Sequence, residues 1–418
     1  MDAPPSVEPP AGRRPLNIIV VVAALGYFVD VYDLILFGIV RTASLKDLGF
    51  TTPEELKTVG MMLLDWQMLG TLLGGILWGV LGDRRGRVSV LYGSIVLYSV
   101  ATGLNGFVHD TTSYAALRVV AGIGLAGELG AGITLVAETM HKEARGWGTT
   151  LVASVGVCGA ALAYVVADVF DWRIAYFVGG GMGLALLVLR MSTYESAMFK
   201  SLLAARAKAI ALGRFDRLFV RRRRFAKYAA SILVGLPISF SIGILMFFAD
   251  HFGRALGVTG QVTAGQAILY GYLGMAVGDL LSGITSQWLR SRRKAIAIFL
   301  GLSLAVDVTY LVVTGLSPTG FYVLCGLLGV TSGYWVLFIT MASEQFGTDI
   351  RATVTTTTPN FVRGLLVPLT SLFLLFEPGL GAPGSGMVVM ALCFLVAFVS
   401  LWWLDETFGK DLDFIEPD

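Results

Sequence analysis

The sequence predicts an all-α membrane protein with twelve transmembrane helices, arranged as two six-helix halves related by pseudo-symmetry. Three observations support this prediction: the composition, the length of the apolar runs and the placement of basic residues. Of the 418 residues, 55% are hydrophobic and only 14% are charged, whereas soluble domains carry about 25% charged residues. The mean hydropathy is +0.74, so we expect most of the chain to lie in a bilayer.

The apolar runs define the elements in order. A helix that crosses a bilayer needs about 20 mostly apolar residues, and runs of that length follow one another along the chain. They cover residues 16–40, 58–81, 87–107, 112–137, 147–167, 173–191, 227–248, 264–289, 294–315, 321–342, 353–376 and 384–404. We therefore expect an N-terminal tail (1–15), a first bundle (16–191), a basic linker (192–226), a second bundle (227–404) and a C-terminal tail (405–418).

Basic residues gather in alternate loops. They are Arg13, Arg14, Arg84, Arg85, Arg87, Lys142, Arg145, Arg221 to Arg224, Arg290, Arg292, Arg293 and Lys294. Because basic loops stay in the cytoplasm, both termini and the linker are predicted there, with the protein in a bacterial cytoplasmic (inner) membrane. The linker run "RFDRLFVRRRRFAK" is either an amphipathic helix on the membrane surface or a charged connection that fixes topology.

The two predicted halves share charged positions at one offset. Adding 206 to the numbers of four residues in the first half leads to four residues of the same type in the second half. The pairs are Arg84 and Arg290, Arg87 and Arg293, Glu138 and Glu344, and Arg145 and Arg351. A single offset for four charged positions indicates internal duplication, which is typical of transporters.

The loop "GDRRGR" after the second predicted helix resembles the signature loop of the major facilitator superfamily, in which Gly79, Gly82, Asp83, Arg84, Gly86 and Arg87 match. The resemblance implies a transporter that works by alternating access, with a cytoplasmic latch that stabilises the outward-facing state. The latch residues that it implies here are Gly79, Asp83, Arg84, Gly86, Arg87, Glu138, Arg145, Glu344 and Arg351. Leu289 stands where the second half would carry the loop aspartate, so its latch is expected to be weaker.

Three further stretches narrow the resemblance. "RVVAGIGLAGELG" (118–130), "YESAMFK" (194–200) and "SEQFGTDIRAT" (343–353) resemble the sugar-porter, metabolite:proton and aromatic-acid:proton symporter branches. The first predicted helix, with "DVYD" before a glycine, resembles that of the organic-acid branches. The resemblance implies proton-coupled uptake of a small organic acid.

Two carboxylates, Asp30 and Asp33, lie inside the first predicted helix, one turn apart and on one face. A charge at the bilayer centre costs at least ~2.5–3.5 kcal/mol, so these residues need a role. Arg118 of the fourth helix lies at the depth of Asp33, and the resemblance places both helices beside a central cavity. We expect an Arg118–Asp33 pair, which is either a switch released by protonation or a purely structural pair.

Other acidic residues lie inside predicted helices. Glu128 has no cation near it in the sequence, and it is either a second proton carrier or a protonated hydrogen-bond donor. For Asp65 we expect a gating or structural role. For Asp307 we expect a structural role, because the resemblance implies that its helix is peripheral. Together, the predicted proton-coupling residues are Asp30, Asp33, Arg118 and Glu128.

Arg363, in the middle of the eleventh predicted helix, is the candidate substrate-binding residue. A cation at this depth needs an anion, and the anion is either the carboxylate of the substrate or that of another helix. Candidate walls of the same site are Gln67, Tyr270, Tyr272, Tyr334 and Trp335.

An enzyme is disfavoured, since the sequence has no nucleophile elbow, phosphate loop or metal cluster. The fifth helix lacks the proline typical of drug/proton antiporters, and the seventh lacks the paired glutamines of sugar porters. Small carboxylates remain, with a zwitterionic osmolyte as an alternative. We expect no cofactor besides the coupling ion, which is a proton with sodium as the open alternative, no metal or nucleic acid, and a monomer.

Overall fold

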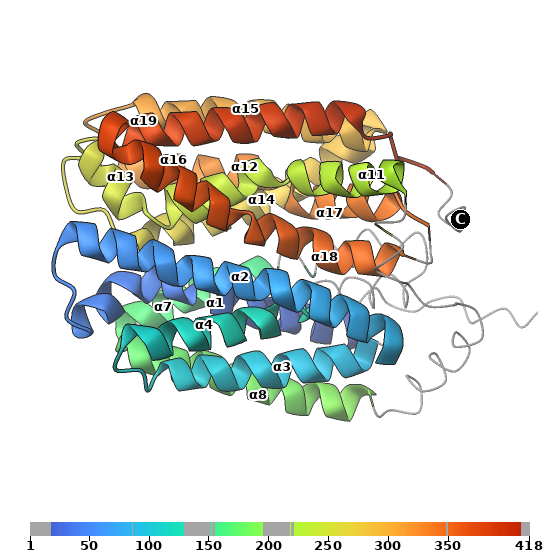
Figure 1. Ribbon diagram of the computed structural model, residues 1–418, viewed down its shortest axis with the longest axis horizontal. Coiled ribbons are helices and arrows are strands. Elements are labelled where there is room, and N and C mark those ends of the chain that lie inside the picture. The colour runs from blue at the N-terminus through green and yellow to red at the C-terminus, as the bar shows by residue number, and fades with distance from the viewer. Residues whose placement is uncertain are drawn as a thin grey trace, which may run out of the picture.

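The computed structural model describes residues 18–85, 87–128, 152, 155–194, 218, 221–347 and 350–410, without the side chains of residues 18, 19, 82–85, 87, 88, 192–194, 351 and 352. All regular secondary structure in these residues is helical (Figure 1), which confirms the predicted all-α class for this part of the chain. The basic linker and both tails fall largely outside the described residues.

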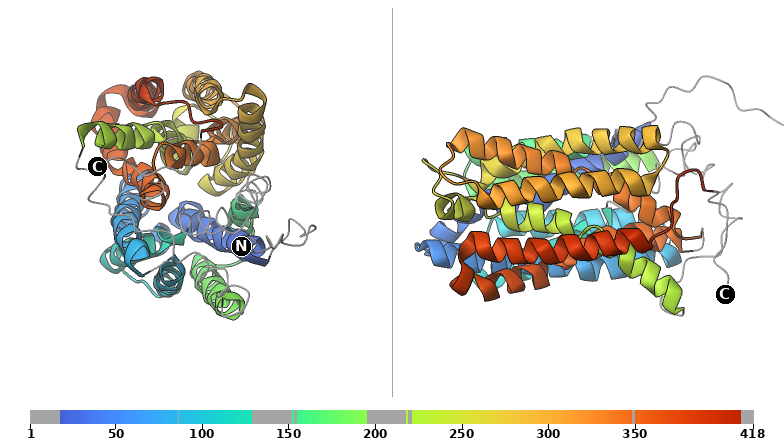
Figure 2. Two further views of the ribbon diagram at one scale, coloured as in Figure 1. Left: turned by 90° about the vertical axis from the view of Figure 1, so that its right-hand side faces the viewer. Right: turned by 90° about the horizontal axis from the view of Figure 1, so that it is seen from above.

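The helices form two groups that lie against each other (Figures 1 and 2). The N half consists of α1 (Ile18–Asp47), α2 (Pro53–Arg85), α3 (Arg87–Asn105), α4 (Thr111–Leu125), α7 (Gly159–Val169) and α8 (Trp172–Tyr194). The C half consists of α11 (Arg222–Leu233), α12 (Leu236–Phe240), the π-helix η1 (Ser241–Met246), α13 (Ala249–Ala255), α14 (Ala264–Leu289), α15 (Arg292–Val312), α16 (Pro318–Ser332), α17 (Trp335–Glu344), α18 (Arg351–Gly364) and α19 (Leu366–Trp403). We call the end where α1 passes into α2 (left in Figure 1) the predicted outer end.

Eight helical stretches in the described residues are long and apolar enough to cross a membrane. One of them, Thr353–Trp403, is 51 residues long and contains two of the predicted spans. It bends at Gly381, whose φ of 68° suits glycine, between Pro378 and Pro383. The count of twelve stays a prediction, because the end of the fourth predicted span lies outside the described residues.

The seventh and tenth predicted spans are broken helices whose breaks lie next to the site. In the seventh, Pro237 lacks a backbone donor and the chain passes from α11 through the short α12 into η1. In the tenth, α16 ends at Ser332 and α17 begins at Trp335, with Gly333 between them. Both breaks lie beside the central cavity, where irregular backbone inside a membrane is tolerated.

Glycines let helices approach closely enough to place the site residues. A Cβ atom at Gly122 of α4 would overlap the backbone oxygen of Gln67 on α2. In the C half, a Cβ atom at Gly329 of α16 would overlap the backbone oxygen of Gly271 on α14. Small residues at helix contacts are typical of membrane bundles, because association there depends on close van der Waals packing.

We expect Gly329→Ala to destabilise the C half by about 1–3 kcal/mol, because the added methyl group must push α14 and α16 apart. The matched control is Gly301→Ala on α15, where an added Cβ meets no atom within 4 Å. The measurement is the midpoint of thermal unfolding in detergent. Equal midpoints for the two variants would contradict the close contact.

Candidate functional site

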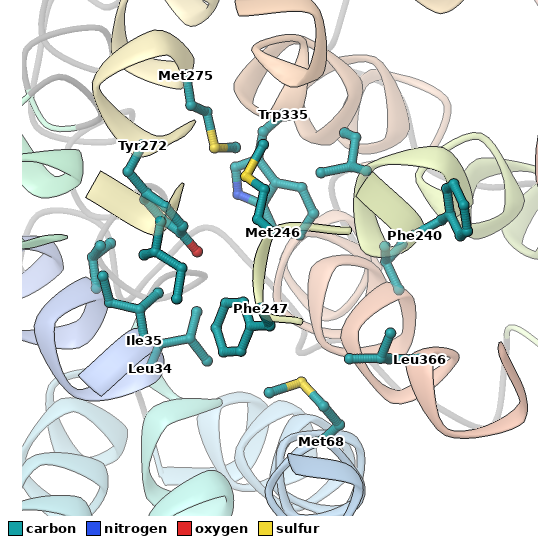
Figure 3. Packing of buried hydrophobic residues seen from close by; sticks show 14 of the residues in the cluster. Leu34, Ile35, Met68, Phe240, Met246, Phe247, Tyr272, Met275, Trp335 and Leu366 are labelled. Atoms are coloured by element: carbon teal, nitrogen blue, oxygen red, sulfur yellow. The ribbon is translucent and has the colours of Figure 1, made fainter. Parts of the chain in front are cut away.

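A cavity with about 620 Å³ of empty space, including its opening to solvent, lies between the two halves. Its walls are mainly apolar and aromatic and come from both halves (Figure 3). The lining residues are Tyr27, Val31, Leu34, Leu64, Met68, Ile238, Ser239, Ile242, Gly243, Phe247, Tyr272, Met275, Trp335, Arg363 and Leu366. Of the predicted substrate-site residues, Arg363, Tyr272 and Trp335 are among them.

Among the residues that the structure describes, Arg363 is the one charged residue that lines this cavity. Its side chain is 8% exposed, its guanidinium lies 5.6 Å from the centre of the Trp335 ring, and Nη1 donates to Asn360 Oδ1 at 3.5 Å. In the part of the chain that the structure describes, it forms no ion pair with a carboxylate. The guanidinium therefore keeps donors for an anion inside the cavity.

Three of the predicted wall residues do not line the cavity: Gln67, Tyr270 and Tyr334. Tyr270 is 41% exposed and stacks on Tyr322, whereas Tyr272 points inward, because residues two apart lie on different faces of a helix. Tyr334 points away from the cavity, and its hydroxyl donates to the backbone oxygen of Val234 at 3.2 Å. The next residue, Trp335 at the start of α17, lines the cavity in its place.

Gln67 is held by Arg118, which corrects the expected Arg118–Asp33 pair. Arg118 Nη2 donates to Gln67 Oε1, Nη1 donates to the Tyr176 hydroxyl at 3.5 Å, and the guanidinium lies 4.7 Å from the centre of the Phe37 ring. The close contact of α2 with α4 brings the Gln67 amide to the arginine. Arg118 acts on Asp33 only through space.

The carboxylates of Asp30 and Asp33 are fully buried, and neither accepts a hydrogen bond of normal geometry from a described residue. Asp30 interacts electrostatically with Arg363 across the boundary between the halves, and with Glu128 and Arg190 within the N half. Gly179 of α8 leaves the space that Asp33 Oδ1 occupies. Asp30 is therefore the predicted proton-coupling residue with a direct electrostatic link to the cavity cation.

Glu128 has a partner that the sequence did not indicate. Arg190, near the end of α8, binds it with both η nitrogens, and Nη1 donates to Oε2 at 2.9 Å. Both side chains are about 1% exposed, and Gly26 of α1 makes room for them four residues before Asp30. Arg190, one of two arginines in the sixth predicted span, was the signal in the sequence that could have pointed to this pair.

The other acidic residues inside the predicted spans, Asp65, Asp279 and Asp307, accept hydrogen bonds from nearby protein groups. The Thr370 hydroxyl of α19 lies 2.8 and 2.7 Å from the two oxygens of Asp65 on α2, shares its hydrogen with that carboxylate and so links the halves. Ser241 donates to Asp307 at 2.8 Å, and the backbone N–H of Val336 donates to Asp279 at 3.2 Å. Asp65, Asp279 and Asp307 do not line the cavity.

Ion pairs join the halves at the predicted outer end. Arg41 Nη2 lies 2.5 Å from Asp250 Oδ1, and Lys57 Nζ lies 2.7 Å from Glu377 Oε2. His251 Nε2 lies 2.5 Å from the other oxygen of Glu377. The outer ends of the halves are therefore in contact in this structure.

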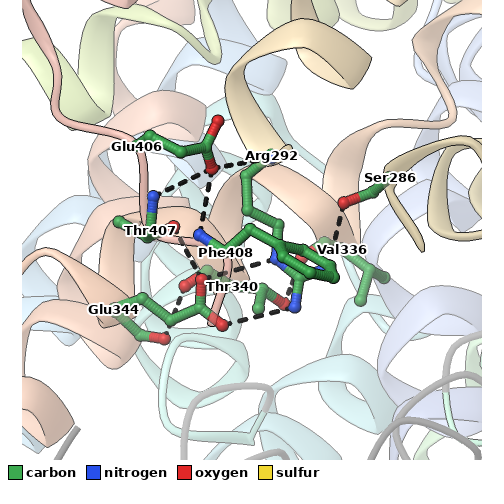
Figure 4. Close-up of polar contacts among 9 residues, drawn as sticks. Ser286, Arg292, Val336, Thr340, Glu344, Glu406, Thr407 and Phe408 are labelled. Atoms are coloured by element: carbon green, nitrogen blue, oxygen red, sulfur yellow. Dashed lines mark hydrogen bonds and ion pairs between the residues drawn. The ribbon is translucent and has the colours of Figure 1, made fainter. Parts of the chain in front are cut away.

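The predicted latch lies mostly outside the described residues and side chains: this applies to Asp83, Arg84, Gly86, Arg87, Glu138, Arg145 and Arg351. Gly79 faces Thr357 of α18. Glu344 pairs with Arg292 at 3.4 Å and accepts a hydrogen bond from Thr407 at 2.7 Å (Figure 4).

Glu406, in the C-terminal segment, caps the start of α15, where the second half lacks a loop aspartate (Figure 4). It accepts hydrogen bonds from the Ser291 hydroxyl and from the backbone N–H groups of Arg292 and Phe408. Burial raises the pKa of this carboxyl, but these hydrogen bonds outweigh burial and hold its pKa below the usual range.

Two helical halves around a central cavity form an architecture that secondary transporters share. The chain belongs to the major facilitator superfamily, whose family model matches residues 23–366. The family resemblance predicted from the "GDRRGR" loop is therefore confirmed.

Two of the relatives that match most of the chain are named for the compound that they transport. It is 26% identical to the niacin transporter NiaP of Acinetobacter baylyi over 372 residues, which cover 79% of this chain and 80% of that protein. It is also 26% identical to the gentisate transporter of Corynebacterium glutamicum over 379 residues, which cover 82% and 77%.

Among solved structures, the chain resembles the proton:xylose symporter XylE bound to 6-bromo-6-deoxy-D-glucose. The TM-score is 0.69, and the alignment covers 94% of this chain and 97% of that one. At 14% identity this likeness shows the fold alone.

We expect Arg190→Ala to cost about 3–5 kcal/mol of stability, because it leaves Glu128 as a buried charge without its bidentate partner. The midpoint of thermal unfolding in detergent measures this effect. The double variant Arg190→Ala/Glu128→Ala should recover most of the loss, since it buries no unpaired carboxylate.

The control for this experiment is Arg254→Ala, which removes a half-exposed arginine that lies 3.7 Å from Asp250 and should cost less than about 1 kcal/mol. A double variant no more stable than Arg190→Ala alone would contradict a charge-compensating role for the pair.

Proposed function

We propose that the protein imports a small carboxylic acid with an aromatic ring, together with protons, by rocker-switch alternating access. The observation that carries the proposal is Arg363, a buried guanidinium without an ion-pair partner among the described residues, on the wall of an otherwise uncharged cavity. The proposed site of action is a bacterial inner membrane, with both termini in the cytoplasm and the protein acting as a monomer.

The chemistry of the cavity supports a monocarboxylate. One guanidinium can hold one carboxylate through two parallel hydrogen bonds, and it is worth more in a low-dielectric site than in water. The remaining walls include Phe247, Trp335, Met68 and Met275, which suit an apolar or aromatic body. A sugar would need many polar partners, and these walls offer few.

The relatives support the same class. Niacin and gentisate are both aromatic rings that carry one carboxylate, and the transporters named for them match this chain over most of its length. A zwitterionic osmolyte would use the same cation, but it would leave the aromatic walls without a matching ligand part.

The proposed coupling uses Asp30 as a competitor of the substrate. While it is ionised, its charge satisfies Arg363 through space. A proton arriving from outside, by way of Asp33 one turn nearer the predicted outer end, neutralises Asp30 and frees the guanidinium for the substrate carboxylate. Proton and substrate then favour the same closed state, which is the thermodynamic requirement for symport.

Alternating access then requires the outer and inner contacts between the halves to form and break in turn. The ion pairs of Arg41 and Lys57 would hold the outer end closed, and the predicted cytoplasmic latch would hold the inner end. Glu128 stays a candidate for a second proton. Its pair with Arg190 lies beside Asp30, so a proton leaving Asp30 inward would meet that pair next.

The first test measures transport in proteoliposomes that hold the purified protein and a trapped pH dye. External nicotinate or 2,5-dihydroxybenzoate should acidify the interior, whereas xylose and glycine betaine should not. Protein-free liposomes correct for passive entry of undissociated acid. Uptake that a sodium gradient drives, without acidification, would overturn proton coupling.

We expect Arg363→Ala to weaken nicotinate binding roughly 100-fold, because two charge-assisted hydrogen bonds are lost. Arg363→Lys keeps the charge but not the planar fork, and it should recover only part of the affinity. Binding is measured by isothermal titration in detergent. Unchanged affinity in Arg363→Ala would remove this residue from the site.

Asp30→Asn imitates the protonated side chain, so substrate binding should persist and lose its dependence on pH, while proton-driven accumulation is abolished. Exchange of labelled for unlabelled substrate across the membrane should continue. The control is Asp307→Asn, a buried carboxylate away from the cavity, which should retain accumulation. Intact pH-dependent accumulation in Asp30→Asn would sink the proposed coupling.

A further inference from the structure

Most buried tyrosines in the described residues use their hydroxyl groups in hydrogen bonds within the protein. Tyr32 donates to the backbone oxygen of Ala175 at 2.8 Å, Tyr310 donates to that of Leu245 at 3.0 Å, and Tyr228 donates to Thr357 at 2.6 Å. This is expected, because a buried phenol without a partner loses the hydrogen bond that it made with water.

Tyr27 and Tyr272 depart from this rule, and both line the cavity. Neither hydroxyl forms a hydrogen bond with a described residue, although both side chains are 6% exposed. Tyr98 also lacks a partner, but its hydroxyl is fully buried and Tyr98 does not line the cavity, whereas Tyr27 and Tyr272 do. In Figure 3 the Tyr272 hydroxyl points toward the space between the two halves.

The two phenols come from opposite halves, and both lie near the charges of Arg363 and Asp30. Tyr27 lies on α1 of the N half, and Tyr272 lies on α14 of the C half. Each interacts electrostatically with Arg363 and with Asp30. Two unpartnered donors and one guanidinium therefore converge on one region of an apolar cavity.

Such an arrangement suits an anion better than a neutral group. A carboxylate has about four lone-pair sites, of which a bidentate arginine uses two, so it can still accept from two phenols. Hydrogen bonds to a charged acceptor are about twice as strong as those between neutral groups. A carboxamide lacks the charge and replaces one acceptor by a donor, so it would fit these three donors poorly.

We propose that Tyr27 and Tyr272 donate hydrogen bonds to the same substrate carboxylate that Arg363 binds, so that one anionic group is held by donors from both halves. This inference rests on the proposed function and adds the specificity-determining residues. Because Tyr27 belongs to one half and Arg363 and Tyr272 to the other, the bound carboxylate draws the halves together. Substrate binding and closure of the cavity are thereby the same event.

The test compares binding of nicotinate and nicotinamide, which share a ring and differ in the carboxylate. Purified protein in lipid nanodiscs is titrated with each compound by calorimetry. We expect Tyr27→Phe and Tyr272→Phe each to weaken nicotinate binding about tenfold, with little effect on nicotinamide. The preference of the protein for the acid over the amide should fall by the same factor.

The matched control is Tyr270→Phe, on the same helix as Tyr272 but outward-facing against Tyr322, and it should leave both affinities unchanged. The midpoint of thermal unfolding without ligand verifies that each variant is folded. If one of the two tyrosine variants does not fold, the other is sufficient, because each makes its own contact with the carboxylate.

A double-variant cycle assigns the shared group. In the Arg363→Ala background, Tyr27→Phe should weaken the binding of 2,5-dihydroxybenzoate and nicotinate by a smaller factor than it does in the unchanged protein. The effects of two residues that bind the same group are not additive. Full additivity would overturn the assignment of the tyrosines to the carboxylate.

The remaining outcomes separate this inference from the proposed function. Nicotinate affinities that stay within twofold in Tyr27→Phe and Tyr272→Phe, but collapse in Arg363→Ala, would overturn the tyrosine clamp and leave the proposed function standing. If none of the aromatic carboxylates binds to the unchanged protein, the proposed function fails first, and the clamp fails with it.

Discussion

The structure depends on how each arginine buried in the membrane interior has its charge compensated. A guanidinium in the membrane interior is tolerated only where other groups compensate its charge. In the N half the protein does this internally, since Arg190 holds Glu128 and Arg118 holds Gln67 and Tyr176. In the C half, Arg363 reaches the cavity with Asn360 and Trp335 in contact, while Asp30 acts on it only through space. The difference marks where a ligand is expected.

Close helix contacts make this division of charges specific. The glycine contact of α2 with α4 sets Gln67 against Arg118, and Gly26 of α1 leaves room for the pair of Glu128 with Arg190. A larger side chain at these positions would overlap its neighbours, so the helices would shift. Because polar partners in a membrane must meet at hydrogen-bond distance, the small residues control electrostatics as much as packing.

The cavity lies where the helices are interrupted. The break at Pro237 and the π-helix after it bring Ile242, Gly243 and Phe247 to the cavity, and the break before α17 turns Trp335 inward. Across the gap, α1 contributes Tyr27 and carries Asp30. A ligand that contacts both sides stabilises their approach, whereas a continuous, fully bonded helix would offer no such adjustable wall.

Hydropathy, charge placement and motifs are local properties, so the sequence by itself determined the helical class, the family and most span positions. The eighth span was predicted at 264–289, where α14 lies, and the burial of Asp30 and Arg363 followed from their place inside apolar runs. Partners were decided only by the tertiary structure. Whether Arg118 meets Asp33 or Gln67, and which cation meets Glu128, depends on the rotation and depth of helices far apart in sequence, which close packing sets and no local pattern encodes.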